Sequence, residues 1–332
     1  MLVNGKHYRK IEEEGVVIPS SSLLKYESKA PKSLQRDACK CCRHIPQSLT
    51  IAIIIAMLLF LFGVGLIAYP YASSWLNQIE QNKVVKNQEE AVSNISKEDL
   101  SAHMDAAQDY NKRLQAGRVL VTDPFDPSIT QTSNEEYESL LNISDDGVMG
   151  QIIIPSINVS MPIYHDVTGK GMDHGVGHMP TTSLPVGGES THCVLAGHTG
   201  LPSAKVFDNL DQLKEGDWFI IKVLGEDHAY RVTSVETVLP EETGSLTIVE
   251  GKDQVTLVTC TPYGVNTHRL LVHAERCDVP EEWNEKRDTS MPPESRLYFE
   301  TPLFILTLVG LVIGISLIIG LIFIRRRYKK KE

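Results

Sequence analysis

Two long apolar segments constrain this chain more than any other feature of its sequence. Residues 49–68 and 303–324 run for 20 and 22 residues without a charged side chain. Each is as long as the roughly 20 residues that an α-helix needs to cross a bilayer. A buried core helix is the alternative, but such a helix normally keeps one polar stripe. The sequence therefore predicts two transmembrane helices.

The charges around these segments predict how the chain is oriented. Residues 1–46 hold nine Lys/Arg and five Asp/Glu, and the last eight residues hold six Lys/Arg and one Glu. Positively charged flanks stay in the cytoplasm. We therefore expect a two-pass protein of the cell membrane, with both termini cytoplasmic and residues 69–302 outside. A signal peptide cleaved near Ala72 is the alternative, but the long leader and apolar core favour an uncleaved anchor.

The part between the two apolar segments is strongly acidic, with 17 Lys/Arg and 36 Asp/Glu. A net charge of −19 disfavours a nucleic-acid partner, because phosphate binding needs a positive face. This charge would suit a cationic surface or partner, although acidity is also ordinary for exported domains.

Six cysteines divide between the two predicted compartments. The leader holds Cys39, Cys41 and Cys42. A cytoplasmic location keeps these thiols reduced, and their spacing with His44 does not match a standard zinc ligand pair. We therefore expect no metal or other cofactor. The outer part holds Cys193, Cys260 and Cys277. An odd number leaves at least one thiol unpaired, and a Cys193–Cys277 disulfide stays open as a possibility.

Periodicity and turn residues predict the order of domains. The repeated apolar positions and the Ser96/Asp99 capping box predict helices before residue 118. Two prolines near Phe125 exclude a helix and predict a stiff loop. Short strands then predict a mainly β barrel or sandwich; we expect them at 149–154, 157–163, 191–196, 218–223, 229–239, 246–249, 255–260 and 270–275. The predicted parts are a leader (1–48), a span (49–68), a helical region (69–118), a lid and linker (119–146), a β domain (147–277), a tether (278–302), a span (303–324) and a tail (325–332).

A cysteine and an arginine lie at facing ends of two predicted strands. Cys260 closes the β-branched run that begins at Val255, and Arg269 opens the next run after a turn. Neighbouring antiparallel strands lie about 5 Å apart, so the thiol and the guanidinium can share one rim. A nearby cation favours the thiolate, which is the nucleophile. The alternative is an inert buried cysteine, which is the commoner case for an isolated one.

A histidine provides the third candidate. His198 follows the strand predicted at 191–196 and has Gly197 before it and Gly200 shortly after it. An imidazole that titrates near neutral pH can protonate a leaving amine. Cysteine with a histidine partner is the usual apparatus of covalent acyl transfer, although a histidine after a strand is more often structural.

Together these residues resemble the sortase family of Gram-positive surface transpeptidases. The resemblance rests on Thr256-Leu257-Val258-Thr259-Cys260 followed by Arg269, with Leu195-Ala196-Gly197-His198 upstream, and covers about residues 97–276. Three features are similar to class C, the pilus-assembling sortases: Cys260-Thr261-Pro262-Tyr263-Gly264, the second span, and Asp123-Pro124-Phe125. Departures from the usual pattern occur at Thr199, Met179-Pro180-Thr181 and His273-Ala274.

The resemblance implies a fold, a site and a reaction. The fold is a closed eight-stranded β-barrel with added helices. Cys260 is the implied nucleophile, His198 the general acid/base, and Arg269 the cation that stabilises the oxyanion or positions the substrate. Asp123, Pro124 and Phe125 are implied to form a lid over the site. The reaction is cleavage of an LPXTG-like sorting signal between Thr and Gly through a thioester, followed by transfer to a lysine amine of a pilin subunit.

Two alternatives keep the same catalytic residues. One is a sortase that anchors surface proteins to the cell wall, which the lid motif and second span disfavour. The other is a membrane-tethered cysteine hydrolase, in which water instead of an amine resolves the thioester. A sorting substrate is a third alternative, but residues 294–302 contain no LPXTG-like motif.

Overall fold

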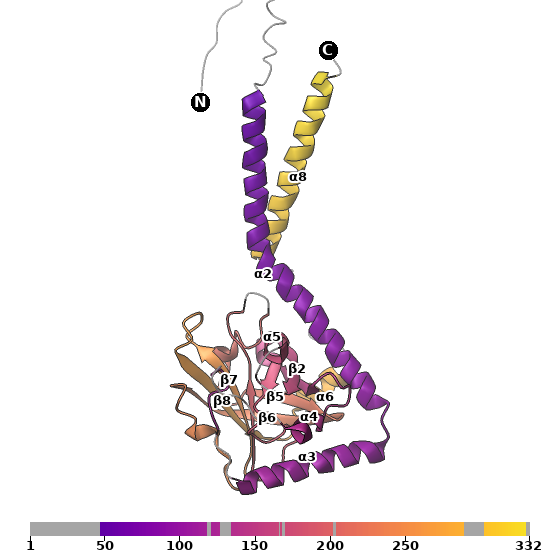
Figure 1. Ribbon diagram of the computed structural model, residues 1–332, viewed down its shortest axis with the longest axis vertical. Helices are drawn as coiled ribbons and strands as arrows, with labels where there is room; N and C mark the ends of the chain where they lie inside the picture. Colours follow the sequence, from indigo (N-terminus) through magenta and orange to yellow (C-terminus); the bar gives the residue numbers. More distant parts are fainter. Residues whose placement is uncertain are drawn as a thin grey trace, which may run out of the picture. The chain divides into compact units, whose positions relative to one another are not determined.

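The computed structural model of the chain describes residues 47–117, 121–126, 134–165, 167, 170–201, 204–288 and 302–329 (Figure 1). Nearly all of the predicted leader, including its three cysteines, lies outside these residues. So do most of the tether and the last three residues. The chain divides into two compact units, Met1–Ile55 and Ala56–Glu332. The second unit contains every strand.

Helices occur at both predicted transmembrane segments. α2 (Gln47–Ser93) contains the first segment and continues well beyond it. Among the described residues, the part of α2 from Ile51 to Ser93 is the one helix that is long and apolar enough to cross a bilayer. α8 (Pro302–Lys329) covers the second segment, but its described apolar stretch, Leu308–Gly320, is shorter than a spanning helix needs. A first membrane anchor is therefore consistent with the fold, and the two-helix flank stays a prediction.

The helix predicted after the first span is present as α3 (Lys97–Gly117), and Ser96 caps its first turn. The Ser96 hydroxyl accepts a hydrogen bond from the Asp99 amide at 3.1 Å and donates to the Asp99 carboxylate at 2.7 Å. The short helices are α4 (Glu135–Ser139), α5 (Lys170–His174), α6 (Glu281–Asp288), η1 (Pro155–Ile157), η2 (Leu210–Gln212) and η3 (Gly244–Leu246).

Eight strands close into a barrel, as expected from the resemblance (Figure 1). They are β1 (Val148–Ile154), β2 (Val159–His165), β3 (Val176–His178), β4 (Thr191–Ala196), β5 (Trp218–Val223), β6 (Glu226–Val238), β7 (Asp253–Thr261) and β8 (His268–Arg276). Their order around the barrel is β1-β2-β3-β4-β7-β8-β6-β5. The β2–β3 and β4–β7 pairs are parallel, and the other six neighbouring pairs are antiparallel.

Two strand assignments differ from the prediction. The strand expected at 246–249 is absent: η3 ends at Leu246, and Val249 is 44% exposed in a loop. β3 was not expected, because it is three residues long and lies in a glycine-rich stretch. It nevertheless pairs with both neighbours, at Ile163↔Val176 and at Gly177↔Ala196, and it completes the ring of strands.

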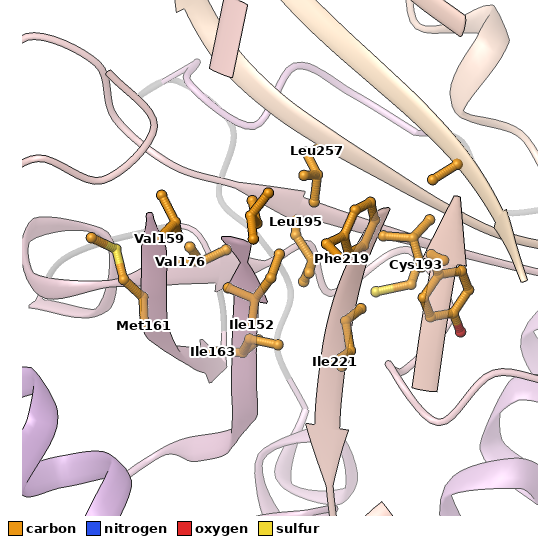
Figure 2. Close-up of a cluster of buried hydrophobic side chains, with 14 of the residues drawn as sticks. Ile152, Val159, Met161, Ile163, Val176, Cys193, Leu195, Phe219, Ile221 and Leu257 are labelled. Carbon is orange, nitrogen blue, oxygen red and sulfur yellow. The ribbon is translucent and has the colours of Figure 1, made fainter. Parts of the chain in front are cut away.

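The interior of the barrel is a single apolar core. Figure 2 shows Ile152, Ile163, Leu195, Phe219 and Leu257 as part of one cluster of buried hydrophobic side chains. Each of these five is fully buried. Successive side chains of a strand point to opposite faces of the sheet. The residues that alternate with these inward-facing residues along each strand therefore lie on the outer face of the barrel.

Part of that outer face is also apolar and buried. Val194 and Ala196 of β4 and Val258 of β7 belong to a second hydrophobic cluster, to which Val121 also contributes and against which Phe125 packs. The predicted lid segment therefore covers the outer surface of the strands that lead to the candidate site.

The disulfide left open by the sequence is absent. Cys193, Cys260 and Cys277 are all free thiols. Cys193 is buried in the barrel core, and burial raises its pKa well above the ordinary value. Its position indicates a packing role, as its neighbours are Leu195, Phe219 and other core residues.

Candidate active site

The predicted pairing of Cys260 with Arg269 is present. Cys260 lies on β7 directly opposite Arg269 on β8 in the antiparallel register. The loop between them contains Pro262 and Gly264, as the turn residues indicated. Cys260 is partly exposed and Arg269 is buried. The thiol and the guanidinium therefore share one end of the barrel.

The parallel pairing of β4 with β7 brings His198 to the same end. The Gly197 amide donates to the Val258 carbonyl at 3.0 Å, and the buried Thr259 hydroxyl donates to the Gly197 carbonyl at 2.7 Å. These bonds hold the residue before His198 against the residues before Cys260. The structure thus brings together His198, Cys260 and Arg269, which the sequence predicted as a group.

The loop after His198 is fixed from its other side. The His198 carbonyl accepts from the Phe207 amide at 3.0 Å, and the Asp208 carboxylate accepts from the Gly200 amide at 2.8 Å. Gly200 has a φ of +78° and lies against the Tyr263 ring, so a glycine is needed there. Sequence reasoning missed Asp208, which lies in no pattern that suggests chemistry, and it used Thr259 only as part of the motif before Cys260 without predicting its bond to Gly197.

Asp123 closes over the site by pairing with Arg269. The Arg269 Nε donates to Asp123 Oδ1 at 2.8 Å, and Arg269 Nη2 donates to Oδ2 at 2.7 Å. This two-bond geometry is the strong form of an Arg–carboxylate pair. The two side chains are only 11% and 9% exposed. The third guanidinium nitrogen donates to the carbonyls of Asn266 and His268, both at 3.1 Å.

Phe125 lies between the histidine and the arginine. The centroid of the Phe125 ring is 5.6 Å from the centroid of the His198 ring. The Arg269 guanidinium carbon lies 5.1 Å from the Phe125 centroid. The Phe125 amide donates to Asp123 Oδ1 at 3.3 Å. Pro124 lines a small gap with Arg269 and the loop after β6. The predicted lid residues Asp123 and Phe125 therefore contact two of the predicted catalytic residues, Arg269 and His198.

A further residue holds the start of the lid. The Thr243 hydroxyl, in the loop between β6 and β7, donates to the Val121 carbonyl at 2.8 Å. No local pattern in the sequence indicates this contact, since the two residues are 122 positions apart.

Burial disfavours the charged form of both the Cys260 thiol and the His198 imidazole. It raises the pKa of the Cys260 thiol; the Arg269 charge opposes this, and Asp123 adds to it. It also lowers the pKa of His198, against the attraction of Asp173 on α5. Burial is the largest single effect on Arg269 and lowers its pKa, but the hydrogen bonds to Asp123 and the charges of Cys260 and Asp123 together outweigh it, so the pKa of Arg269 is raised. Among the described residues, no group of three or more His, Cys, Asp and Glu side chains is arranged to hold a metal ion.

Comparison with known proteins agrees with this geometry. The family model for the sortase domain matches residues 152–277. The crystal structure of sortase C-1 from Actinomyces oris is 49% identical, with 54% of this chain and 99% of that chain covered and a TM-score of 0.50. This chain belongs to the sortase family. Sortase C-1 from Streptococcus pneumoniae is 38% identical, with 60% and 100% covered and a TM-score of 0.56. Sortase A of Bacillus anthracis is 27% identical over 221 residues, which are 66% of this sortase and 91% of that protein.

The solved neighbours confirm the resemblance to class C sortases. The matched region contains His198, Cys260 and Arg269, while the lid residues Asp123–Phe125 lie before the match to the family model. The chemical roles of the three residues, and of the lid, stay predictions.

Proposed function

We propose that this sortase is a membrane-anchored cysteine transpeptidase that polymerises pilin subunits. It cleaves an LPXTG-like sorting signal between Thr and Gly and transfers the threonyl acyl group to a pilin lysine amine. One observation carries the proposal: Cys260 faces Arg269 across β7 and β8, His198 follows the neighbouring strand β4, and Asp123 and Phe125 contact Arg269 and His198.

In the first half of the reaction, His198 takes the thiol proton of Cys260 as the sulfur attacks the threonine carbonyl carbon. The carbon–nitrogen bond then breaks, and His198 donates a proton to the departing glycine amine. Arg269, freed from Asp123, donates hydrogen bonds to the developing oxyanion. The product is a Cys260 thioester of the donor protein.

In the second half, the lysine amine of the next subunit attacks the thioester carbonyl. His198 takes a proton from that amine and passes it to the sulfur as the carbon–sulfur bond breaks, which returns the Cys260 thiol. The apolar outer surface of β4 and β7 beside the site disfavours water as a competing nucleophile. This preference distinguishes a transpeptidase from a hydrolase with the same residues.

The lid is proposed to keep the resting enzyme inactive. Asp123 neutralises Arg269 through two hydrogen bonds, and Phe125 lies against His198. A donor peptide must displace both before its carbonyl reaches Cys260. The lid motif favours pilus assembly over the anchoring of surface proteins to the cell wall.

We propose a two-pass membrane topology for the chain. α2 enters and α8 leaves the outer compartment, both termini are cytoplasmic, and the barrel lies outside. The charges that flank the two apolar segments support this orientation. Donor and acceptor proteins that are exported through the same membrane then meet the site on its outer side.

The test is replacement of the nucleophile in the full-length protein in its own cell. We expect Cys260→Ala to abolish the ladder of covalent pilin polymers on a denaturing gel, because no thioester can form. Cys277→Ala is the matched control, since it removes another free thiol of the barrel domain and should leave the ladder intact. Ladders that persist in a Cys260→Ala strain without any other sortase would refute the proposal.

A further inference from the structure

An open pocket lies beside the start of the lid, away from the three catalytic residues. Its volume is about 490 Å³, which is within the range of ligand-binding pockets. Its walls come from the end of α3, the segment after β3, the start of β4 and the loop before β7. Val121 and Leu246 belong both to this wall and to the outer apolar cluster that the lid covers.

The pocket and the site are joined by a single strand. His192 near the start of β4 lines the pocket, and His198 follows the end of the same strand. Six residues separate them, which corresponds to about 20 Å at roughly 3.3 Å per extended residue. The outer face between them carries buried Val194 and Ala196.

The chain itself provides a peptide that follows this path. Val121 lines the pocket, and four residues later Phe125 lies between His198 and Arg269. Both pack on the outer apolar cluster. A non-helical segment therefore already runs from the pocket to the catalytic end, with its N-terminal side at the pocket.

We infer that this pocket is a subsite for the donor protein, and that it binds the residues immediately before the sorting motif. The inference rests on the proposed function. A donor peptide that replaces the lid in the same direction has its reacting carbonyl at Cys260 and its N-terminal side over β4. A donor residue that lies about 20 Å upstream of that carbonyl is roughly the sixth residue before the scissile bond. In a five-residue motif cleaved after its fourth residue, that position lies one or two residues before the motif.

The walls of the pocket define what it binds. Leu114 and Ile248 provide apolar contacts that remain when the donor replaces the lid segment from Val121 to Phe125. The buried Thr181 hydroxyl has no hydrogen-bond partner among the described residues, so it is available to a peptide group. Glu250 is exposed and is the one acidic side chain in the wall. The subsite therefore prefers an apolar residue with a basic residue beside it, and disfavours an acidic one.

The test compares peptides of different length. The enzyme is the full-length protein in detergent, with Phe125→Ala to loosen the lid. Three peptides are compared as substrates: the bare sorting motif, the motif extended by six residues on its N-terminal side, and the motif with an equal extension on its C-terminal side. The N-terminal extension carries a leucine and a lysine at the fifth to seventh positions before the scissile bond. We expect it to raise kcat/KM about tenfold, the order that one extra side chain in an apolar pocket supplies. The gain should appear in KM, because the contact is far from the reacting bond.

Two substitutions assign this gain to the pocket. Thr247→Trp fills the pocket and should remove the gain without changing kcat/KM for the bare motif. Glu250→Lys should weaken the lysine-bearing peptide and favour one with glutamate instead. Glu241→Lys, the same charge change in the same loop but outside the pocket wall, is the control and should change neither.

The outcomes separate the subsite from the proposed function. Equal rates for the bare and N-terminally extended motifs, or a gain that survives both Thr247→Trp and Glu250→Lys, would overturn the subsite while cleavage still supports the transpeptidase. A gain from the C-terminal extension that Thr247→Trp removes would overturn the proposed direction of binding. Failure to cleave the bare motif, or cleavage that persists in Cys260→Ala, would overturn the proposed function and the subsite with it.

Discussion

Replacing Asp123 with asparagine tests the lid through one ion pair. The change keeps the size of the side chain but removes its charge and one of its two acceptor oxygens. In the wild type, those oxygens accept from Arg269 Nε and Nη2 at 2.8 and 2.7 Å. The variant keeps at most one, weaker hydrogen bond to the guanidinium. We therefore expect the lid to open more often.

The size of the effect follows from the two bonds. A hydrogen bond to a charged group contributes about 1.5–3 kcal/mol, so we assign about 2 kcal/mol to the loss. The two side chains are 11% and 9% exposed, so solvent screens this pair much less than a surface ion pair. Since about 1.4 kcal/mol corresponds to a factor of ten, the open population should rise roughly 30-fold.

The assay measures the alkylation rate of Cys260 by a bulky maleimide that the closed lid excludes. Rates are followed by peptide mapping at fixed pH, and Cys277, at the other end of β8, is the internal reference. A pH profile separates access from reactivity. Removing the Asp123 charge should also lower the pKa of Cys260, because that charge raises it in the wild type. The inflection of the rate should therefore move to lower pH.

Asp211→Asn is the control for this experiment. It changes the net charge equally at an exposed position of η2, and it should leave the labelling rate of Cys260 unchanged. If Asp123→Asn labels no faster than wild type, the ion pair does not hold the lid closed. If Cys260 of the variant is labelled faster but the inflection of the pH profile does not shift, Asp123 controls access to Cys260 and has no effect on the pKa of its thiol.

Three further predictions concern the oxyanion, the barrel and pH. Arg269→Lys keeps the charge but loses the planar fork, and we expect kcat/KM for the bare motif to fall about 100-fold, as for loss of an oxyanion donor; an unchanged value would exclude this role. Gly150→Ala places a methyl group against the Lys222 carbonyl of β5, and we expect about 1–3 kcal/mol of destabilisation, seen as a lower Tm in thermal melts. Burial lowers the pKa of His178 to about 3 from an ordinary 6.5. As the pH falls, His178 is therefore protonated in the unfolded chain before it is protonated in the folded one. The free energy of unfolding decreases below pH 6.5, by about 2 kcal/mol at pH 5 from His178 alone. A Tm that does not fall between pH 7 and 5 would contradict this.

Local features of the sequence predicted the part of the site that is local in the chain. Cys260 and Arg269 are nine residues apart in a strand–turn–strand segment, so alternation and turn residues suffice to set them opposite each other. The stiff loop around Phe125 was also predictable, because two prolines exclude a helix. The cap that Ser96 provides was predictable as well, because its partner Asp99 is only three residues away.

The remainder depends on contacts between distant residues. β3 has too few residues to show alternation and exists because β2 and β4 both pair with it. Residues 246–249 have strand-like composition but no neighbouring strand with a free edge. Thr243 reaches Val121 across 122 positions. Pairwise contacts of this kind leave no periodic pattern in a single sequence, so only the folded chain reveals them.

The parallel pairing of β4 with β7 explains how the site is both assembled and controlled. Parallel strands end at the same edge, so His198 and Cys260, 62 positions apart, meet without any local relation. The outward residues of the same strands form the apolar surface on which the lid lies. In the proposed mechanism, a donor peptide that binds this surface must displace Asp123, and this single step has two effects. It opens access to Cys260, and it removes the negative charge that raises the pKa of Cys260 while freeing Arg269 to stabilise an anion. Access and reactivity are then coupled through one ion pair, because the binding surface and the catalytic residues belong to the same two strands.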